Sequence, residues 1–144
     1  MPEISVLVDL NIVIDVLQHR QPFYEDSAAI LDAVSQGKIN GYLAAHSITT
    51  LVYVITRLQN QAVAMAAIRK LLTVFTVAEV NDATIRLALD WNWPDFEDAV
   101  QMATAVHTQA DYLITRNRKD FPSQPLPVLE PLEFLTLLAN SDVT

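Results

Sequence analysis

The chain has 144 residues, of which 51% are hydrophobic and none is cysteine. Its length suits one domain with one core, and its composition predicts a compact fold rather than disorder. The lack of cysteine excludes disulfides, thiolate zinc sites and cysteine nucleophiles. A formal net charge of −8 argues against broad electrostatic binding to nucleic acid, but it does not exclude nucleic acid as a substrate.

The sequence indicates neither a signal peptide nor a membrane span. No basic segment followed by an apolar run opens the chain, and the longest apolar stretches are too short to cross a bilayer. We therefore expect a cytoplasmic protein that has no membrane partner.

Strand-like and helix-like segments alternate along the chain. In the first half, the patterns predict a strand over 4–8, helices over 11–17 and 22–35, a strand over 39–44, and helices over 47–58, with Ser47 as its cap, and 61–72. In the second half, they predict a strand over 72–77, helices over 81–90 and 95–107, strands over 112–115 and 128–129, and a helix over 131–139. This alternation predicts an α/β fold with a parallel sheet covered on both faces. We expect one domain over residues 1–140 and a flexible tail over 141–144.

Polar residues follow the first predicted strand directly. Asp9 ends the apolar run, and Asn11 and Asp15 come soon after it. In an open parallel α/β sheet, the carboxyl ends of the strands line one crevice where ligands bind. Asp9 is therefore a candidate functional residue, although it would also cap the following helix well. Asn11 and Asp15 can likewise be interpreted as a turn residue and a surface residue.

A second acidic group opens the predicted helix over 95–107. Asp95 and Asp98 are three residues apart, which resembles a capping box, and a carboxylate in the first turn is stabilised by the helix dipole. Capping alone explains both residues. Because a first-turn carboxylate can equally hold a metal, we interpret Asp98 as functional and Asp95 mainly as a cap.

A polar loop follows the predicted strand over 112–115. Asn117 and Asp120 offer the hard oxygen ligands that suit Mg²⁺ or Mn²⁺. If this strand neighbours the first one, Thr115 and the loop lie at the same sheet edge as Asp9. The basic side chains that could position phosphate are Arg116, Arg118 and Lys119. The plain alternative is a loop whose charges are solvated.

Carboxylates gathered at one sheet edge repel one another unless a cation lies between them. The pattern therefore predicts a hard divalent metal ion and phosphoryl chemistry. The chain has no P-loop, G-x-G-x-x-G or G-x-S-x-G motif, so nucleotide triphosphatases, Rossmann dehydrogenases and α/β-hydrolases lack their signatures. A receiver-like phosphoacceptor domain also gathers acidic residues beside a strand end. It needs a lysine at a later strand end, however, and Lys119 is a poor candidate because it lies in the loop.

Four segments resemble, in order, the motifs of a PIN domain, which is the fold of the VapC-type ribonuclease toxins. They are residues 8–15, 47–53, 95–99 and 112–121. Each motif alone is weakly specific. Their ordered combination is fairly specific for the family, and it spans nearly the whole chain.

The resemblance implies a three-layer α/β fold whose parallel sheet has roughly five strands. It also implies an endoribonuclease that depends on Mg²⁺ or Mn²⁺, the toxin of a type II toxin–antitoxin system. Such a protein cuts RNA, forms a homodimer and pairs with an antitoxin protein. By motif match, Asp9 and Asp98 are metal ligands, and Asn11 orders the site beside Asp9.

Two positions depart from the family's pattern. The second motif usually supplies a glutamate where this chain has Thr50, and the fourth often has an aspartate where it has Asn117. The implied cluster is Asp9, Asp98, Asn117 and Asp120, with Thr50 holding a water or touching substrate. Because one carboxylate is lost, the alternative is a catalytically degenerate PIN scaffold that binds RNA or a protein partner.

Overall fold

The computed structural model describes residues 4–123 and 125–142. The strands of this part form one sheet in the order β3-β2-β1-β4-β5, and all neighbouring strands are parallel. They are β1 (Ser5–Val8), β2 (Asn40–Ala44), β3 (Thr76–Ala78), β4 (Tyr112–Ile114) and β5 (Val128–Leu129). The predicted five-stranded parallel sheet is therefore confirmed.

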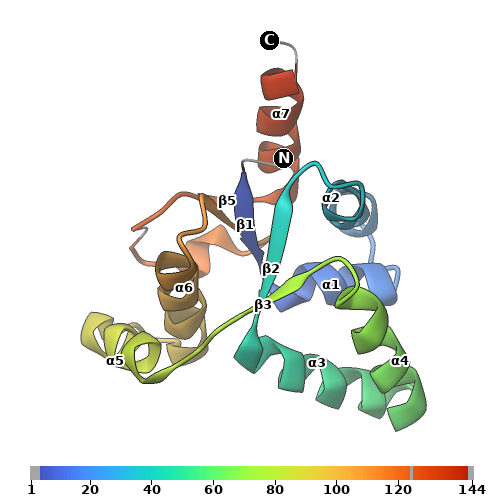
Figure 1. The fold of residues 1–144 in the computed structure, drawn as a ribbon, viewed down its shortest axis with the longest axis horizontal. Helices are drawn as coiled ribbons and strands as arrows, with labels where there is room; N and C mark the ends of the chain where they lie inside the picture. The colour runs from blue at the N-terminus through green and yellow to red at the C-terminus, as the bar shows by residue number, and fades with distance from the viewer. Residues whose placement is uncertain (1–3, 124, 143–144) are drawn as a thin grey trace.

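Helices connect the strands and cover both faces of the sheet (Figure 1). They are α1 (Leu10–Leu17), α2 (Tyr24–Ser35), α3 (Ala45–Leu58), α4 (Gln61–Leu71), α5 (Asp82–Trp91), α6 (Phe96–Thr108), the short 3-10 helix η1 (Arg118–Asp120) and α7 (Pro131–Asp142). Figure 1 shows α5 and α6 on one side of the sheet and α1 to α4 on the other, while α7 packs against α2. The fold thus has the three layers that the resemblance implied.

Strand β1 shows why the sheet needs a covering layer on each face. Its residues Val6, Leu7 and Val8 are all fully buried. Val6 and Val8 belong to the core cluster that contains Ile12 of α1, whereas Leu7 belongs to the cluster that contains Met102 of α6. Because successive strand residues point to opposite faces, this apolar run is stable only between two helical layers.

The structure differs from the prediction at the start of α3 and at the start of β3. Helix α3 begins at Ala45, directly after β2, so Ser47 is a buried first-turn residue and not the N-cap. The reason is that no loop residue separates β2 from α3. Strand β3 begins at Thr76 rather than at residue 72, because the chain still turns there and the Phe75 N–H donates to the Leu71 carbonyl at 2.8 Å.

The last helix is longer than predicted. Helix α7 continues to Asp142, past the expected end at residue 139, so it includes residues that were assigned to the tail. Residues 143 and 144 of that predicted tail lie outside the described residues. Among the residues that the structure describes, no helix has the length and apolar character that a membrane span requires.

Gly41 of β2 offers a test of the packing between the sheet and α2. A Cβ atom built there would lie 2.7 Å from Val34 Cγ2 and 2.8 Å from Phe75 Cε1, both in buried side chains. We expect Gly41→Ala to lower the free energy of unfolding by about 1–3 kcal/mol, because overpacking forces such side chains off their rotamers. Urea denaturation measures the loss. Ser35→Ala on the exposed end of α2 is the control, and an equal effect of both substitutions would contradict the close approach.

Candidate metal centre

Asp9 lies where β1 gives way to α1, at the carboxyl edge of the sheet. Its backbone N–H donates to the Ile114 carbonyl of β4 at 2.9 Å, which fixes the two strand ends beside each other. Its side chain caps α1 by accepting the Asn11 N–H at 3.5 Å. Only 7% of the residue is exposed. Asp9 therefore caps α1 and also occupies a central position at the carboxyl edge of the sheet.

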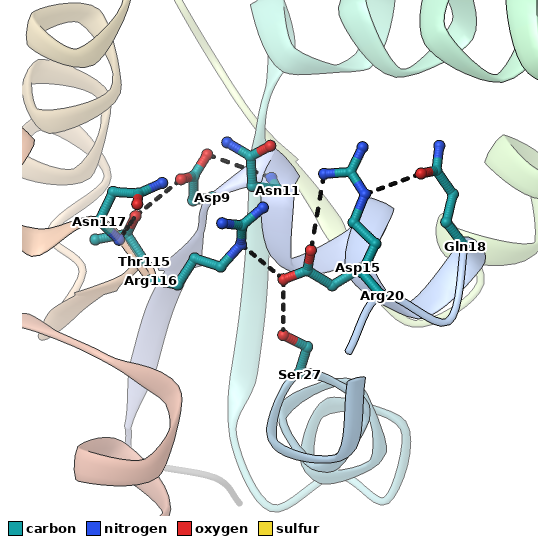
Figure 2. Close-up of polar contacts among 9 residues, drawn as sticks. All are labelled: Asp9, Asn11, Asp15, Gln18, Arg20, Ser27, Thr115, Arg116 and Asn117. Carbon is teal, nitrogen blue, oxygen red and sulfur yellow. Dashed lines mark hydrogen bonds and ion pairs between the residues drawn. The ribbon is translucent and has the colours of Figure 1, made fainter. Parts of the chain in front are cut away.

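Two further side chains hold the Asp9 carboxylate. The Thr115 hydroxyl donates to Oδ2 at 2.9 Å, and the Gln101 amide Nε2 donates to Oδ1 at 2.9 Å. Figure 2 shows Thr115 approaching Asp9 from the segment after β4. Burial raises the pKa of Asp9 above its ordinary value, and these hydrogen bonds oppose the rise. All of these donors are neutral, so none of them cancels the charge of the carboxylate.

The start of α6 brings a second acidic group to this edge. Asp95 is the N-cap and accepts the Asp98 N–H at 3.2 Å, as the capping interpretation expected. Asp98 itself is half-buried, and its pKa rises to about 7. Burial is the largest cause, and repulsion from Asp95, Asp9, Asp120 and Glu97 adds to it. The carboxyl of Asp98 therefore loses its proton at a markedly higher pH than an ordinary aspartate does.

Glu97 and Gln101 received no role in the sequence analysis. Burial and the charges of Asp95 and Asp9 raise the pKa of Glu97, which places this carboxyl in the same acidic field. The position of Glu97 directly before Asp98 in the sequence is a signal from which its place in this acidic group could be predicted. Gln101 stands between apolar residues of α6, and nothing in the local sequence indicates that its side chain reaches Asp9.

Asp15 belongs to a separate network (Figure 2). The sequence interpretation as a surface residue is wrong, because Asp15 is fully buried. Its Oδ2 accepts from Arg116 Nε at 2.9 Å and from the Ser27 hydroxyl at 3.3 Å, and Arg20 lies 4.0 Å from Oδ1. Asp15 thereby joins α1 to α2 and to the chain after β4, and its charge is compensated, unlike that of Asp9.

The predicted phosphate-binding loop is partly engaged in ion pairs. The side chain of Arg116 is 20% exposed, contacts Asp15 and lies 4.2 Å from the Phe23 ring centroid. Arg118 donates to both carboxylate oxygens of Glu133, at 2.6 and 2.7 Å. Lys119 is exposed. The structure thus leaves Lys119 more accessible than the two arginines.

The remaining predicted residues take different positions. Asn117 is half-buried and donates its backbone N–H to the Thr115 hydroxyl at 3.1 Å, while Asp120 is exposed at the end of η1. Thr50, which stands where the family usually has glutamate, donates to the His46 carbonyl of its own helix at 3.5 Å. Helix α3 therefore brings no carboxylate at this position.

The donor set suits a hard divalent cation that keeps part of its water shell. Within residues 4–123 and 125–142, no group of three or more histidine, aspartate or glutamate side chains is arranged to hold a metal ion. Mg²⁺, however, is commonly bound by one or two carboxylates and otherwise by water and substrate phosphate. Asp9 has neutral donors only, and Asp98 is repelled by its neighbours. A cation bound by Asp9 and Asp98 would compensate the charge of Asp9 and offset the repulsion that acts on Asp98.

The Asp15 network generates a prediction about stability. Arg116→Met leaves the buried Asp15 carboxylate without its closest cation, so we expect the free energy of unfolding to fall by about 3–5 kcal/mol. Urea denaturation measures this loss. In the double variant Asp15→Leu/Arg116→Met both charges are gone, and most of the stability should return. Unchanged stability of the single variant would show that the ion pair does not support the fold.

The raised pKa of Asp98 predicts how the stability of the metal-free protein depends on pH. The carboxyl shifts from an ordinary value of 3.8 to about 7 on folding, so the folded state binds the proton more tightly than the unfolded state. The resulting stabilisation is complete below the lower value and is lost as the pH rises through the higher one. Urea titrations in EDTA across this range should show a steeper decline for the wild type than for Asp98→Asn. Parallel declines would contradict the assignment.

The comparisons with known proteins agree with this architecture. The family model described as PIN domain matches residues 5–119. Ribonuclease VapC1 from Aquifex aeolicus is 27% identical over 135 residues, which cover 90% of this chain and 92% of that protein.

Two solved structures show the same fold. VapBC-1 from nontypeable Haemophilus influenzae has a TM-score of 0.71 at 20% identity and covers 90% of this chain and 99% of its own. A toxin-antitoxin complex from Klebsiella pneumoniae has a TM-score of 0.68 at 23% identity, with coverages of 88% and 98%. With the family model spanning most of its length, this chain belongs to the PIN domain family.

Proposed function

We propose that this protein is a metal-dependent endoribonuclease, the toxin component of a type II toxin–antitoxin system. The observation that carries the proposal is the placement of Asp9 and Asp98 in one acidic field at the carboxyl edge of the sheet. Similarity over nearly the full length to a protein named Ribonuclease VapC1 supports it. So does the fold shared with VapBC-1 from nontypeable Haemophilus influenzae and with the toxin-antitoxin complex from Klebsiella pneumoniae.

We assign the metal to Asp9 and Asp98, and we assign Asn117 and Asp120, in the chain after β4, as the further ligands. A bound Mg²⁺ or Mn²⁺ supplies Lewis-acid chemistry that acidifies a water and neutralises charge on a phosphodiester. Thr115 and Gln101 hold the Asp9 carboxylate in one orientation. The raised pKa of Asp98 favours its protonated form, and a cation bound there would displace that proton.

The loop after β4 is the proposed contact to the RNA backbone. Lys119 is exposed and can meet a phosphate directly. Arg118 would have to exchange its pairing with Glu133 for a phosphate, which an exposed ion pair of little net energy permits. Arg116 keeps its structural pairing with Asp15 in this proposal.

A protein partner and a homodimer also belong to this proposal, as does a location in the cytoplasm. Leu17, Leu58 and Val63 are each more than 40% exposed, and they line an apolar groove formed by α1, α3 and α4. Exposed apolar surface of this kind is typical of protein interfaces. An antitoxin or a second copy of the chain would bury it.

A PIN scaffold without catalysis is the second candidate. Thr50 replaces the usual glutamate, and the described residues contain no ready-made group of three metal-binding carboxylates. This candidate predicts little Mn²⁺ binding and no rise in Tm when Mn²⁺ is added. The nuclease proposal predicts the opposite.

The direct test is cleavage of total RNA by the purified protein in the presence of Mn²⁺. We expect cleavage by the wild type, its loss in EDTA, and a decrease of about 100-fold or more in Asp98→Asn, because a metal-binding carboxylate is removed. Asp90→Asn, an exposed residue of α5, is the matched control and should cut like the wild type. Full activity of Asp98→Asn would contradict the proposed centre, and absence of both cleavage and Mn²⁺ binding would favour the scaffold.

A further inference from the structure

Gln101 is a buried polar residue whose contact with Asp9 crosses from one layer of the fold to the sheet. Only 2% of it is exposed, and its Nε2 lies 2.9 Å from Asp9 Oδ1. Its neighbours on α6, among them Val100 and Met102, are apolar and fill the core. Packing alone would be served by another apolar side chain at this position.

The spacing along α6 places Gln101 with the acidic residues of the first turn. It follows Asp98 by three residues and Glu97 by four, and residues at these separations are neighbours on one helix face. The face of α6 that presents Asp98 is therefore also the face that reaches Asp9. Gln101 therefore shares a helix face with one proposed metal ligand, Asp98, and donates to the other, Asp9.

The chemistry of the amide fixes how Gln101 is oriented. Only the NH₂ group can donate to a carboxylate, so Oε1 must point elsewhere, and this oxygen is buried without a donor among the described residues. A buried acceptor left unsatisfied lowers the free energy of unfolding. An apolar side chain at this position would fill the core without leaving an acceptor unsatisfied. The presence of glutamine is therefore better explained by its hydrogen bond to Asp9 than by stability alone.

Gln101 and Thr115 together hold both oxygens of Asp9. Thr115 donates to Oδ2 from the end of β4, and Gln101 donates to Oδ1 from α6. Two donors, one on each oxygen, restrict the rotation of the carboxylate and fix the direction of its remaining lone pairs. Ligands of metal ions are commonly oriented by such outer hydrogen bonds.

We propose that Gln101 is a positioning residue that orients the Asp9 carboxylate for binding of the divalent cation. The inference rests on the proposed function, because it requires Asp9 to be a metal ligand. It assigns to α6 a second contribution besides Asp98. It also accounts for an amide within an otherwise apolar part of the helix.

The test compares Mn²⁺ binding by variants that differ only in the hydrogen bond to Asp9. Gln101→Met keeps a long unbranched side chain but cannot donate, so we expect its Mn²⁺ affinity to fall about 10–100-fold, as for loss of an outer-shell partner. The control is Thr104→Val, since Thr104 is also fully buried on α6 but donates to the Val100 carbonyl of its own helix at 2.7 Å. Isothermal titration calorimetry gives the affinities, and thermal melts in EDTA establish that each variant is folded.

The outcomes separate this inference from the proposed function. Weakened binding by Gln101→Met with near-normal binding by Thr104→Val supports the positioning role. Normal binding by Gln101→Met, or equal losses in both variants, overturns that role and leaves the metal centre standing. A wild type that binds no Mn²⁺ overturns the metal centre and the positioning role together. If Gln101→Met does not fold, Gln101→Asn, whose shorter amide cannot reach Asp9, replaces it with the same expected loss.

Discussion

The pairing of β1 with β4 is the constraint on which the candidate site depends. It places the end of β1 beside the end of β4, where the Asp9 N–H donates to the Ile114 carbonyl. Thr115, the next residue along, then reaches the Asp9 side chain. Because all strands of the sheet are parallel, the loops that carry Asn117 and Asp120 leave from this same edge. Residues more than a hundred positions apart therefore share one site.

Asp9 at the start of α1 and Asp15 within it are both buried, but their surroundings give them different roles. Asp15 meets Arg116, and the cation makes its burial tolerable. Asp9 meets only neutral donors, which stabilise a carboxylate without neutralising it. A charge that is held in place but not compensated attracts a cation, whereas a compensated charge does not. This difference is the reason why the proposed centre uses Asp9 and not Asp15.

The first turn of α6 contributes a second group of carboxylates to the candidate site. Asp95 caps the helix, and the helix dipole favours Glu97 and Asp98 after it. The same residues that start the helix also create the repulsion that raises the pKa of Asp98. Helix capping and the helix dipole thus explain why acidic residues occur here. The nearby charge of Asp9 adds to the repulsion that raises the pKa of Asp98. The lack of a glutamate at Thr50 leaves α6 as the main acidic contributor opposite β1.

The alternation of strands and helices, the position of Asp9 after a buried strand, and the cap at Asp95 could be predicted from the sequence, because these features depend on neighbours within a few residues. The motif order was enough to indicate the PIN fold. The burial of Asp15, the ion pairs of Arg116 and Arg118, and the contact of Gln101 with Asp9 could not be predicted in this way. Those features join segments 15 to 101 residues apart, and helix periodicity or capping patterns carry no information about such distant partners. They become visible only when strand order and helix packing fix which side chains meet.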